Sequence, residues 1–409
     1  MMRKRYWIPL TLLSFAAVGF FGFAPGYVEG SMNVVDGKPL IEVSAEARAF
    51  HGTLAIVDLH SDSLMWNRDI NNRAGRGHMD LPRLLDGNVA LQLFSSVTKT
   101  PKNQNYDSNG ADTDNITLLT IAQLQPIKTW GSLVERSLYH ADRLKEVLRR
   151  NSLALADDRN LVPWFLVDHS NGVTRLQKDH GPDRGPQQHP FPRGVMLTIE
   201  GLQNLEGKAS NLDRLYNAGF RMAGLTHFFD NELGGSMHGL KKGGLTPFGR
   251  DIVRWMEAKG MIVDIAHLSH TGVAELLAMA TRPVVFSHGG VQATCKVNRN
   301  LTDDEIRGVA KTGGVVGIGY WDAAICDTSP RSAVKAMKHV RDLVGIDHVA
   351  LGSDYDGATT VRFDTSQLVQ VTQALIDEGF SPQEIRAVMG GNALRVIRAG
   401  IVPTAGVAK

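Results

Sequence analysis

The chain lacks several features that would assign a class of protein at once. Its 409 residues include only two cysteines, Cys295 and Cys326, which excludes a fold stapled by many disulfides. Neither has a second Cys or His at the close spacing of a structural zinc site. In an exported protein the two can pair, and two unpaired buried thiols are the alternative. Lys and Arg number 44 against 42 Asp and Glu, and this balance gives no argument for nucleic acid or an acidic partner.

Long hydrophobic runs are also missing, except near the N-terminus. Residues 7–23 are apolar apart from one proline, one threonine, one serine and two glycines, and Arg3-Lys4-Arg5 precede them. A basic cluster before an apolar run is typical of an export signal. We predict that residues 1–30 are a signal peptide or a membrane anchor, and that the protein is exported to a bacterial-type periplasm or cell envelope. The run is close to the lower limit of about 17 residues for a spanning helix, so cleavage and tethering through residues 7–23 both remain open.

What the chain does contain is a regular alternation. From about residue 45 onward, short β-prone runs alternate with stretches long enough for crossover helices. Eight such repeats favour a closed parallel barrel over an open sheet. We therefore predict an α/β fold, a (β/α)8 TIM barrel over residues 45–400. The predicted strands are Ala55–His60, Val89–Phe94, Val195–Glu200, Met222–Thr226, Met261–Ala266, Val284–Ser287, Val315–Tyr320 and Val349–Ser353.

Helix signals and two insertions complete the outline. Thr302 followed by Glu305 is typical of a capping box, and Ser381-Pro382 of a helix start. The segment Lys99–Gly131 predicts a loop and helix that cover the barrel mouth as a lid. The segment Asn171–Arg193 predicts an exposed loop whose histidines, His180 and His189, are solvated. The predicted helices are Asn211–Ala218, Thr246–Lys259, Thr271–Ala280, Thr302–Lys311 and Ser332–Val344.

Metal-binding or proton-handling side chains stand where five of the strands end. The C-terminal strand ends of a (β/α)8 barrel open onto one face, where catalytic groups collect. An imidazole and a carboxylate two residues apart share a face of an extended strand, and such donors suit a divalent cation such as zinc. A carboxylate beside a metal-bound water can also move its proton. The residues are His60, Asp62, Glu200, His267, His288 and Asp354.

Other polar residues near the strand ends have more than one interpretation. His227 follows the fourth strand, and Arg299 follows the sixth, where an arginine can grip a substrate carboxylate in bidentate fashion. A surface arginine is the alternative. We expect His270 to support the site or face solvent, Asp264 to be structural, and Asp356 to be a turn residue or helix cap.

Taken together, these segments resemble the membrane (renal) dipeptidases, a peptidase family of zinc (β/α)8 barrels. The resemblance runs from about Val57 to Val396. It is carried by His60-Ser61-Asp62, His78-Met79-Asp80-Leu81-Pro82-Arg83, Ile199-Glu200-Gly201, Gly219-Phe220-Arg221, Leu225-Thr226-His227, Gly244-Leu245-Thr246-Pro247-Phe248-Gly249, Asp264-Ile265-Ala266-His267, Phe286-Ser287-His288, Arg299-Asn300, Gly352-Ser353-Asp354-Tyr355-Asp356-Gly357 and Gly391-Asn392-Ala393-Leu394-Arg395.

The resemblance implies a dipeptidase with two zinc ions. Under it, His60 and Asp62 hold one ion, His267 and His288 hold the other, and Glu200 bridges them. A shared water or hydroxide attacks the peptide carbonyl. Asp354 shuttles the proton, His227 stabilises the oxyanion, and Arg299 grips the carboxylate of the dipeptide, with some tolerance for a C-terminal D-residue. Cys295 and Cys326 fall where family members carry a disulfide, and the family also suggests a homodimer.

Some positions depart from the family pattern. Ser61 stands where Asn is usual, Leu202-Gln203 stand where Gly-His is common, and Gly289 replaces a serine. None is a ligand, so these departures bear on substrate choice more than on metal binding. Two alternatives to a dipeptidase therefore remain: a hydrolase of the same fold that acts on a lactam, lactone or acyl amino acid, and a non-catalytic metal-binding protein of the envelope.

Overall fold

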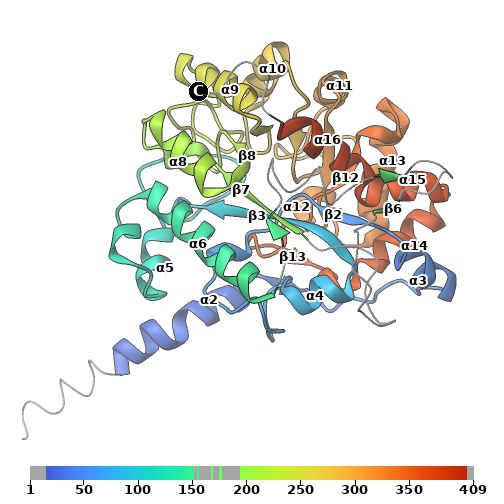
Figure 1. Ribbon diagram of the computed structural model, residues 1–409, viewed down its shortest axis with the longest axis horizontal. Coiled ribbons are helices and arrows are strands. Elements are labelled where there is room, and N and C mark those ends of the chain that lie inside the picture. The colour runs from blue at the N-terminus through green and yellow to red at the C-terminus, as the bar shows by residue number, and fades with distance from the viewer. Residues whose placement is uncertain (1–14, 152–153, 156–166, 169–174, 177–193, 403–409) are drawn as a thin grey trace, which may run out of the picture.

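Eight parallel strands close into a barrel in the computed structural model, which describes residues 15–151, 154–155, 167–168, 175–176 and 194–402 (Figure 1). The strand order is β3-β2-β12-β11-β10-β9-β8-β7, and pairing of β3 with β7 completes the closure. All eight predicted strands are present, so the predicted (β/α)8 fold is confirmed. The strands are β2 (Ile56–Asp58), β3 (Val89–Val97), β7 (Gly194–Glu200), β8 (Phe220–Gly224), β9 (Ile262–Asp264), β10 (Val285–Phe286), β11 (Val315–Ile318) and β12 (Val349–Leu351).

One apolar cluster takes at least one side chain from each of the eight barrel strands. Examples are Val57 on β2, Met196 on β7 and Val285 on β10, all inaccessible to solvent. Contributions from every strand are expected of a packed barrel interior. The C-terminal helix α16 (Asn392–Gly400) packs into the same cluster through residues such as Val396. The barrel is therefore solid below its mouth, and the site has to lie at its rim.

Helices surround the barrel, and several begin where the sequence predicts. The Thr246 hydroxyl accepts from the Gly249 amide at the start of α9. Thr302 with Glu305, and Ser381 with Glu384, form complete capping boxes. The outer helices are α3 (Ala45–His51), α4 (Leu81–Asp86), α6 (Leu133–Asn151), α8 (Ser210–Ala218), α9 (Pro247–Lys259), α10 (His270–Met279), α11 (Asp303–Lys311), α12 (Asp322–Ile325), α13 (Pro330–Val344), α14 (Val369–Asp377) and α15 (Pro382–Arg386).

The chain ahead of the barrel also packs against it. Helix α2 (Ala24–Met32) is followed by β1 (Val34–Val35), which pairs in parallel with β13 (Thr360–Val361). Residues 1–14, which hold the basic cluster and half of the apolar run, lie outside the described part. Within the described part, no helix combines the length and the hydropathy needed to cross a bilayer.

The two insertions have different outcomes. The segment Lys99–Gly131 contains helix α5 (Ile116–Ala122) and a short turn at Ile127–Thr129. Its action as a lid stays a prediction. His180 and His189 lie outside the described residues, so the exposed loop predicted around them also stays a prediction.

Candidate metal centre

The first set of predicted ligands meets at the end of β2. His60 and Asp62 lie two and four residues beyond the last residue of that strand, and Glu200 ends β7. The His60 Nε2 atom lies 3.4 Å from Asp62 Oδ1 and 3.6 Å from Glu200 Oε2. The three side chains are nearly inaccessible to solvent. One imidazole and two carboxylates around one point form a donor set suited to a divalent cation.

The second set shares Glu200 with the first. His267 Nε2 lies 2.8 Å from Glu200 Oε1, and His288 Nε2 lies 3.2 Å from the same oxygen. The two imidazole nitrogens are 3.1 Å apart. Two neutral histidines and a carboxylate oxygen therefore point at one another, an arrangement that a cation held among them would stabilise.

A test of fit comes from buried polar atoms without hydrogen-bond partners among the described residues. His60 Nε2, Asp62 Oδ1 and both carboxylate oxygens of Glu200 belong to this group. Buried polar atoms are normally satisfied, and leaving several unsatisfied in one place is costly. Their donor types are those of zinc and related ions. The residues present therefore fit a metal centre.

Electrostatics in the site favour added positive charge. Burial, together with the neighbouring charge of Glu200, raises the pKa of Asp62 to about 7. Burial also lowers the pKa of His267 and of His288 well below its ordinary value. Crowded carboxylates beside neutral histidines describe a site that gains from a cation, because a cation relieves the repulsion between the acids.

Hydrogen bonds behind the ligands hold two of the strand ends in place. Asp264, expected to be structural, accepts from the Ser287 hydroxyl at 2.5 Å and the Ser287 amide at 3.0 Å. Ser287 Oγ in turn lies 2.8 Å from His288 Nδ1 and so orients that ring. On the other side, Asp58 accepts from the amide of Ser353 at 2.8 Å. The role of Asp58 was missed from the sequence, although it follows the same pattern as Asp264: an acid at the last residue of its strand.

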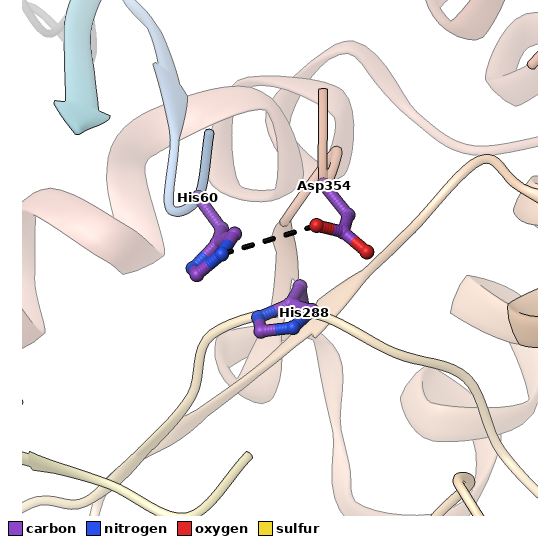
Figure 2. Close-up of side chains that lie close together, drawn as sticks. All are labelled: His60, His288 and Asp354. Carbon is purple, nitrogen blue, oxygen red and sulfur yellow. Dashed lines mark ion pairs between the residues drawn. The ribbon is translucent and has the colours of Figure 1, made fainter. Parts of the chain in front are cut away.

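Asp354 faces the centre from beyond the end of β12, the strand that pairs with β2. Figure 2 shows its carboxylate directed towards His60 and His288, and the Oδ1 atom lies 3.9 Å from His60 Nε2. Burial and the nearby acids raise its pKa well above the ordinary value. Asp354 and His267 also have positive φ angles of 56° and 64°. Strained backbone of this kind is concentrated at functional sites.

His227 and Arg299 complete the set predicted from the sequence. His227 Nε2 lies 3.5 Å from Glu200 Oε2, and its buried Nδ1 has no hydrogen-bond partner among the described residues. Arg299 is 1% exposed. Its Nη2 donates to the His288 carbonyl at 2.8 Å, while its buried Nη1 has no hydrogen-bond partner in the part of the chain that the structure describes. The alternative of a surface arginine is therefore wrong. Arg299 is buried in the site, and its Nη1 is available to bind a ligand.

His270 and Asp356 were expected to lie outside the set of metal ligands. His270 begins α10 and lies 2.6 Å from Glu305 Oε1, away from the metal centre. Asp356 is in a turn with a φ of 64°. It is not a helix cap, because it is fully buried in an ion pair with Arg68 and accepts from the His78 amide at 2.6 Å. This long-range pair could not be inferred from the Asp-Gly turn signal.

A cavity of about 460 Å³ opens over the centre. Asp62, Glu200, His227, His267, Arg299 and Asp354 line it on one side. Its other walls include Trp66, Tyr106 and Trp321, together with residues of α2 and α5. These aromatic residues were missed from the sequence because they lie in loops and carry no spacing signal. A cavity of this size suits a small molecule.

Comparisons with known proteins agree with this site. The family model described as membrane dipeptidase (peptidase family M19) matches residues 186–402, more than half of the chain. The dipeptidase AclJ of Aspergillus oryzae is 30% identical over 365 residues, or 84% of this chain and 77% of that protein. An uncharacterized dipeptidase of Schizosaccharomyces pombe is 29% identical over 332 residues, or 78% of this chain and 72% of that protein.

Solved structures show the same fold. The probable dipeptidase PvdM of Pseudomonas aeruginosa aligns with a TM-score of 0.67 at 17% identity, covering 87% of this chain and 98% of that one. A metallo peptidase of Rhodobacter sphaeroides, liganded with a phosphinate mimic of the dipeptide L-Ala-D-Ala, aligns with a TM-score of 0.62 at 20% identity, covering 85% and 99%. The family match together with the 30% identical relative shows that this chain is a peptide hydrolase of the membrane dipeptidase family, peptidase family M19.

Proposed function

We propose that this chain hydrolyses the peptide bond of dipeptides with two divalent cations, zinc in the first instance. The observation that carries the proposal is the position of Glu200. Its Oε1 faces His267 and His288, and its Oε2 faces His60. A carboxylate between two donor sets suits a pair of metal ions. His60 and Asp62 would hold one ion, His267 and His288 the other, and Glu200 both.

The cations, when bound, supply Lewis acidity that polarises a carbonyl and lowers the pKa of water. The remaining work falls to side chains around the cavity. Asp354 lines the cavity and can take a proton from the attacking water and return it to the leaving amine. Neutral His227 can donate an N–H to the oxygen on which negative charge develops. The free edge of Arg299 can hold the terminal carboxylate of the dipeptide.

The first test measures metal and activity on the same sample of the full chain. Elemental analysis is expected to give about two zinc ions per chain, and a panel of L,L- and L,D-dipeptides is expected to be cleaved. Chelation should abolish cleavage, and zinc should restore it. Glu200→Gln keeps the shape of the side chain but removes its charge, so it should lose metal and activity together.

Glu206→Gln is the matched control, because Glu206 is exposed and contacts Ser132 rather than the site. It should keep both metal and activity. Two bound metals without cleavage of any dipeptide would move the substrate towards lactams or acyl amino acids. A protein without metal would overturn the proposal.

We also propose that the protein is exported to the cell envelope, with residues 7–23 as a cleavable signal or a tether. The basic cluster Arg3-Lys4-Arg5 before the apolar run supports this proposal. Fractionation of expressing cells would test it, since activity in the cytosolic fraction alone would contradict export. A homodimer stays a prediction from the family resemblance.

A further inference from the structure

Helix α2 lies beside the candidate active site, although most of its residues fall in the segment 1–30 predicted to be a signal peptide or membrane anchor. Figure 1 shows it as the blue helix at the edge of the barrel. It packs against α5. Val28 on α2 and Leu119 on α5 both contact a small cluster of buried residues that includes Trp66 and Ile116. The helix is therefore part of the packed protein.

A buried ion pair fastens this helix to the active-site side of the barrel. Glu29 is 1% exposed and pairs with Arg68, and its other oxygen lies 2.7 Å from Arg76 Nε. Arg68 also pairs with Asp356, two residues after Asp354. Separating such a pair leaves a buried charge without its partner and is strongly unfavourable.

Backbone contacts extend the attachment beyond the helix. The Asn33 side-chain oxygen accepts from the Ala358 amide at 2.9 Å. The Val34 amide donates to the Thr359 carbonyl at 3.1 Å. Both partners lie in the loop that follows Asp354, so the segment from α2 to β1 and the loop that carries the proton-handling carboxylate support each other.

The inner face of α2 lines the cavity over the metal centre. Val28 and Met32 are among the residues that line the cavity, together with Glu200 and Asp354. The α5 side chains Ile116 and Leu119 continue the same wall, so this side of the cavity is apolar. An apolar wall facing a polar centre favours a substrate with one apolar side chain, since burying that side chain removes it from water.

We infer that α2 forms a specificity-determining wall of the substrate pocket, and that Val28 and Met32 favour dipeptides with a bulky apolar side chain. This inference rests on the proposed dipeptidase function. It assigns the helix to the mature enzyme, because removing residues 1–30 would delete Val28 and the Glu29 ion pair together.

The test compares two dipeptide substrates across three variants of the full chain. Met32→Glu places a charge on the wall at a position that is 42% exposed and tolerates it. Val28→Ala shortens the wall conservatively. Tyr27→Ala is the matched control, because Tyr27 is 70% exposed on the same helix and does not line the cavity. The substrates are Leu-Leu, which is bulky and apolar, and Ala-Ala, which is small.

Met32→Glu is expected to lower kcat/KM for Leu-Leu about tenfold or more, because burial of a leucine side chain is worth at least that factor. The change for Ala-Ala should stay below about twofold. Val28→Ala should shift the ratio in the same direction by a smaller factor, and Tyr27→Ala should leave it unchanged. Metal content and melting temperature are measured for each variant, so that unfolding or metal loss is recognised separately.

Equal loss for both substrates in folded, metal-loaded Met32→Glu and Val28→Ala would overturn the inference while leaving the dipeptidase function standing. An equal shift in Tyr27→Ala would also overturn it. Failure of the wild-type enzyme to cleave either dipeptide, or any other, would instead overturn the proposed function, and the inference with it.

Discussion

Arg299 is a guanidinium buried at the site with only part of its hydrogen-bonding capacity used. Its Nη2 donates to the His288 carbonyl, while no described residue forms a hydrogen bond with its Nη1. The side chain lies over the rings of Phe286 and Trp321, at 5.5 and 5.9 Å from their centroids. These contacts fix its direction before substrate arrives. A fixed, partly unpaired cation in a cavity is suited to binding an anion.

If Arg299 binds the terminal carboxylate of the dipeptide, its removal should weaken the binding of substrates that carry this carboxylate. Arg299→Ala should raise KM for a free dipeptide by about 10- to 100-fold, since hydrogen bonds to charged groups are worth about 1.5–3 kcal/mol. Steady-state kinetics on the dipeptide and on its C-terminal amide would check this. The amide lacks the carboxylate, so wild type and variant should differ little on it. Arg299→Lys should recover part of the loss, and an unchanged KM in Arg299→Ala would contradict the assignment.

The position of polar residues at the ends of apolar runs predicted most of the side chains that meet at the candidate site. Glu200 directly follows an apolar residue, and His288 is separated from its apolar run only by Ser287. In a parallel barrel such positions converge at one rim. Glu29 shows the opposite case. Glu29 lies within the predicted signal segment, and its partner Arg68 is 39 residues away in sequence, so only the folded chain brings the two together. Tertiary ion pairs leave no local pattern.

The loop between β10 and α11 carries Arg299, and a disulfide and a set of hydrogen bonds hold it in place. Cys295 and Cys326 form a disulfide with a Cα–Cα distance of 5.3 Å, which confirms the pairing implied by the family resemblance. The Asn300 side chain donates to the carbonyls of Cys295 and Ala324, both at 2.8 Å. The disulfide therefore joins the Arg299 loop to α12.

Removing this disulfide is expected to cost stability first and substrate affinity second. The bonded cysteines are 31 residues apart, and closing a loop of that length is worth about 3–4 kcal/mol in the chain-entropy account. The double variant Cys295→Ser/Cys326→Ser should therefore unfold at a lower temperature. KM should rise more than kcat falls, since Asn300 still holds the loop but Arg299 gains freedom.

A reductant supplies the control for the disulfide. It should lower the melting temperature of the wild type towards that of the double variant and should leave the variant itself unchanged. Equal melting temperatures of wild type and variant without reductant would show that the disulfide does not stabilise the folded enzyme.

The existence of the barrel strands was predictable from the sequence, but some properties of the elements were not. Strand existence was predictable because each barrel strand is a buried apolar run, whereas strand length was not: the run Val284–Ser287 yields only Val285–Phe286. The packing of helix α2 was not predicted, because an apolar N-terminal stretch suits both a leader and a helix packed on a barrel. Its packing against α5 joins residues that are distant in sequence and therefore leaves no local pattern.

Across the whole molecule, buried neutral histidines connect elements that are distant in sequence. His51 on α3 is 5% exposed, with Nδ1 2.8 Å from Thr372 Oγ1 on α14 and Nε2 3.2 Å from the Gly87 carbonyl. His140 on α6 is 1% exposed and lies 2.9 Å from Ser96 Oγ on β3. Both lie away from the metal centre, so their titration reports on the fold.

Stability should therefore fall in mild acid. Burial lowers the pKa of His51 to about 4, and burial with the charges of Arg143 and Arg136 lowers that of His140 to about 3. Both values lie below the ordinary 6.5, so the unfolded chain binds protons that the folded chain rejects. Stability is present above pH 6.5 and is lost as the pH falls, by roughly 2 kcal/mol per pH unit near pH 5 for the two together.

Thermal unfolding of chelated protein between pH 7 and 4.5 would check this without a contribution from metal loss. The double variant His51→Gln/His140→Gln should show a shallower fall than wild type. His270 provides a control of opposite sign: its hydrogen bond with Glu305 raises its pKa, so its stabilisation is present below pH 6.5 and lost at higher pH. His270→Gln should therefore lower stability by a constant amount below pH 6.5 and leave the slope of the fall near pH 5 unchanged. Parallel curves for wild type and the double variant would show that acid acts elsewhere in the molecule.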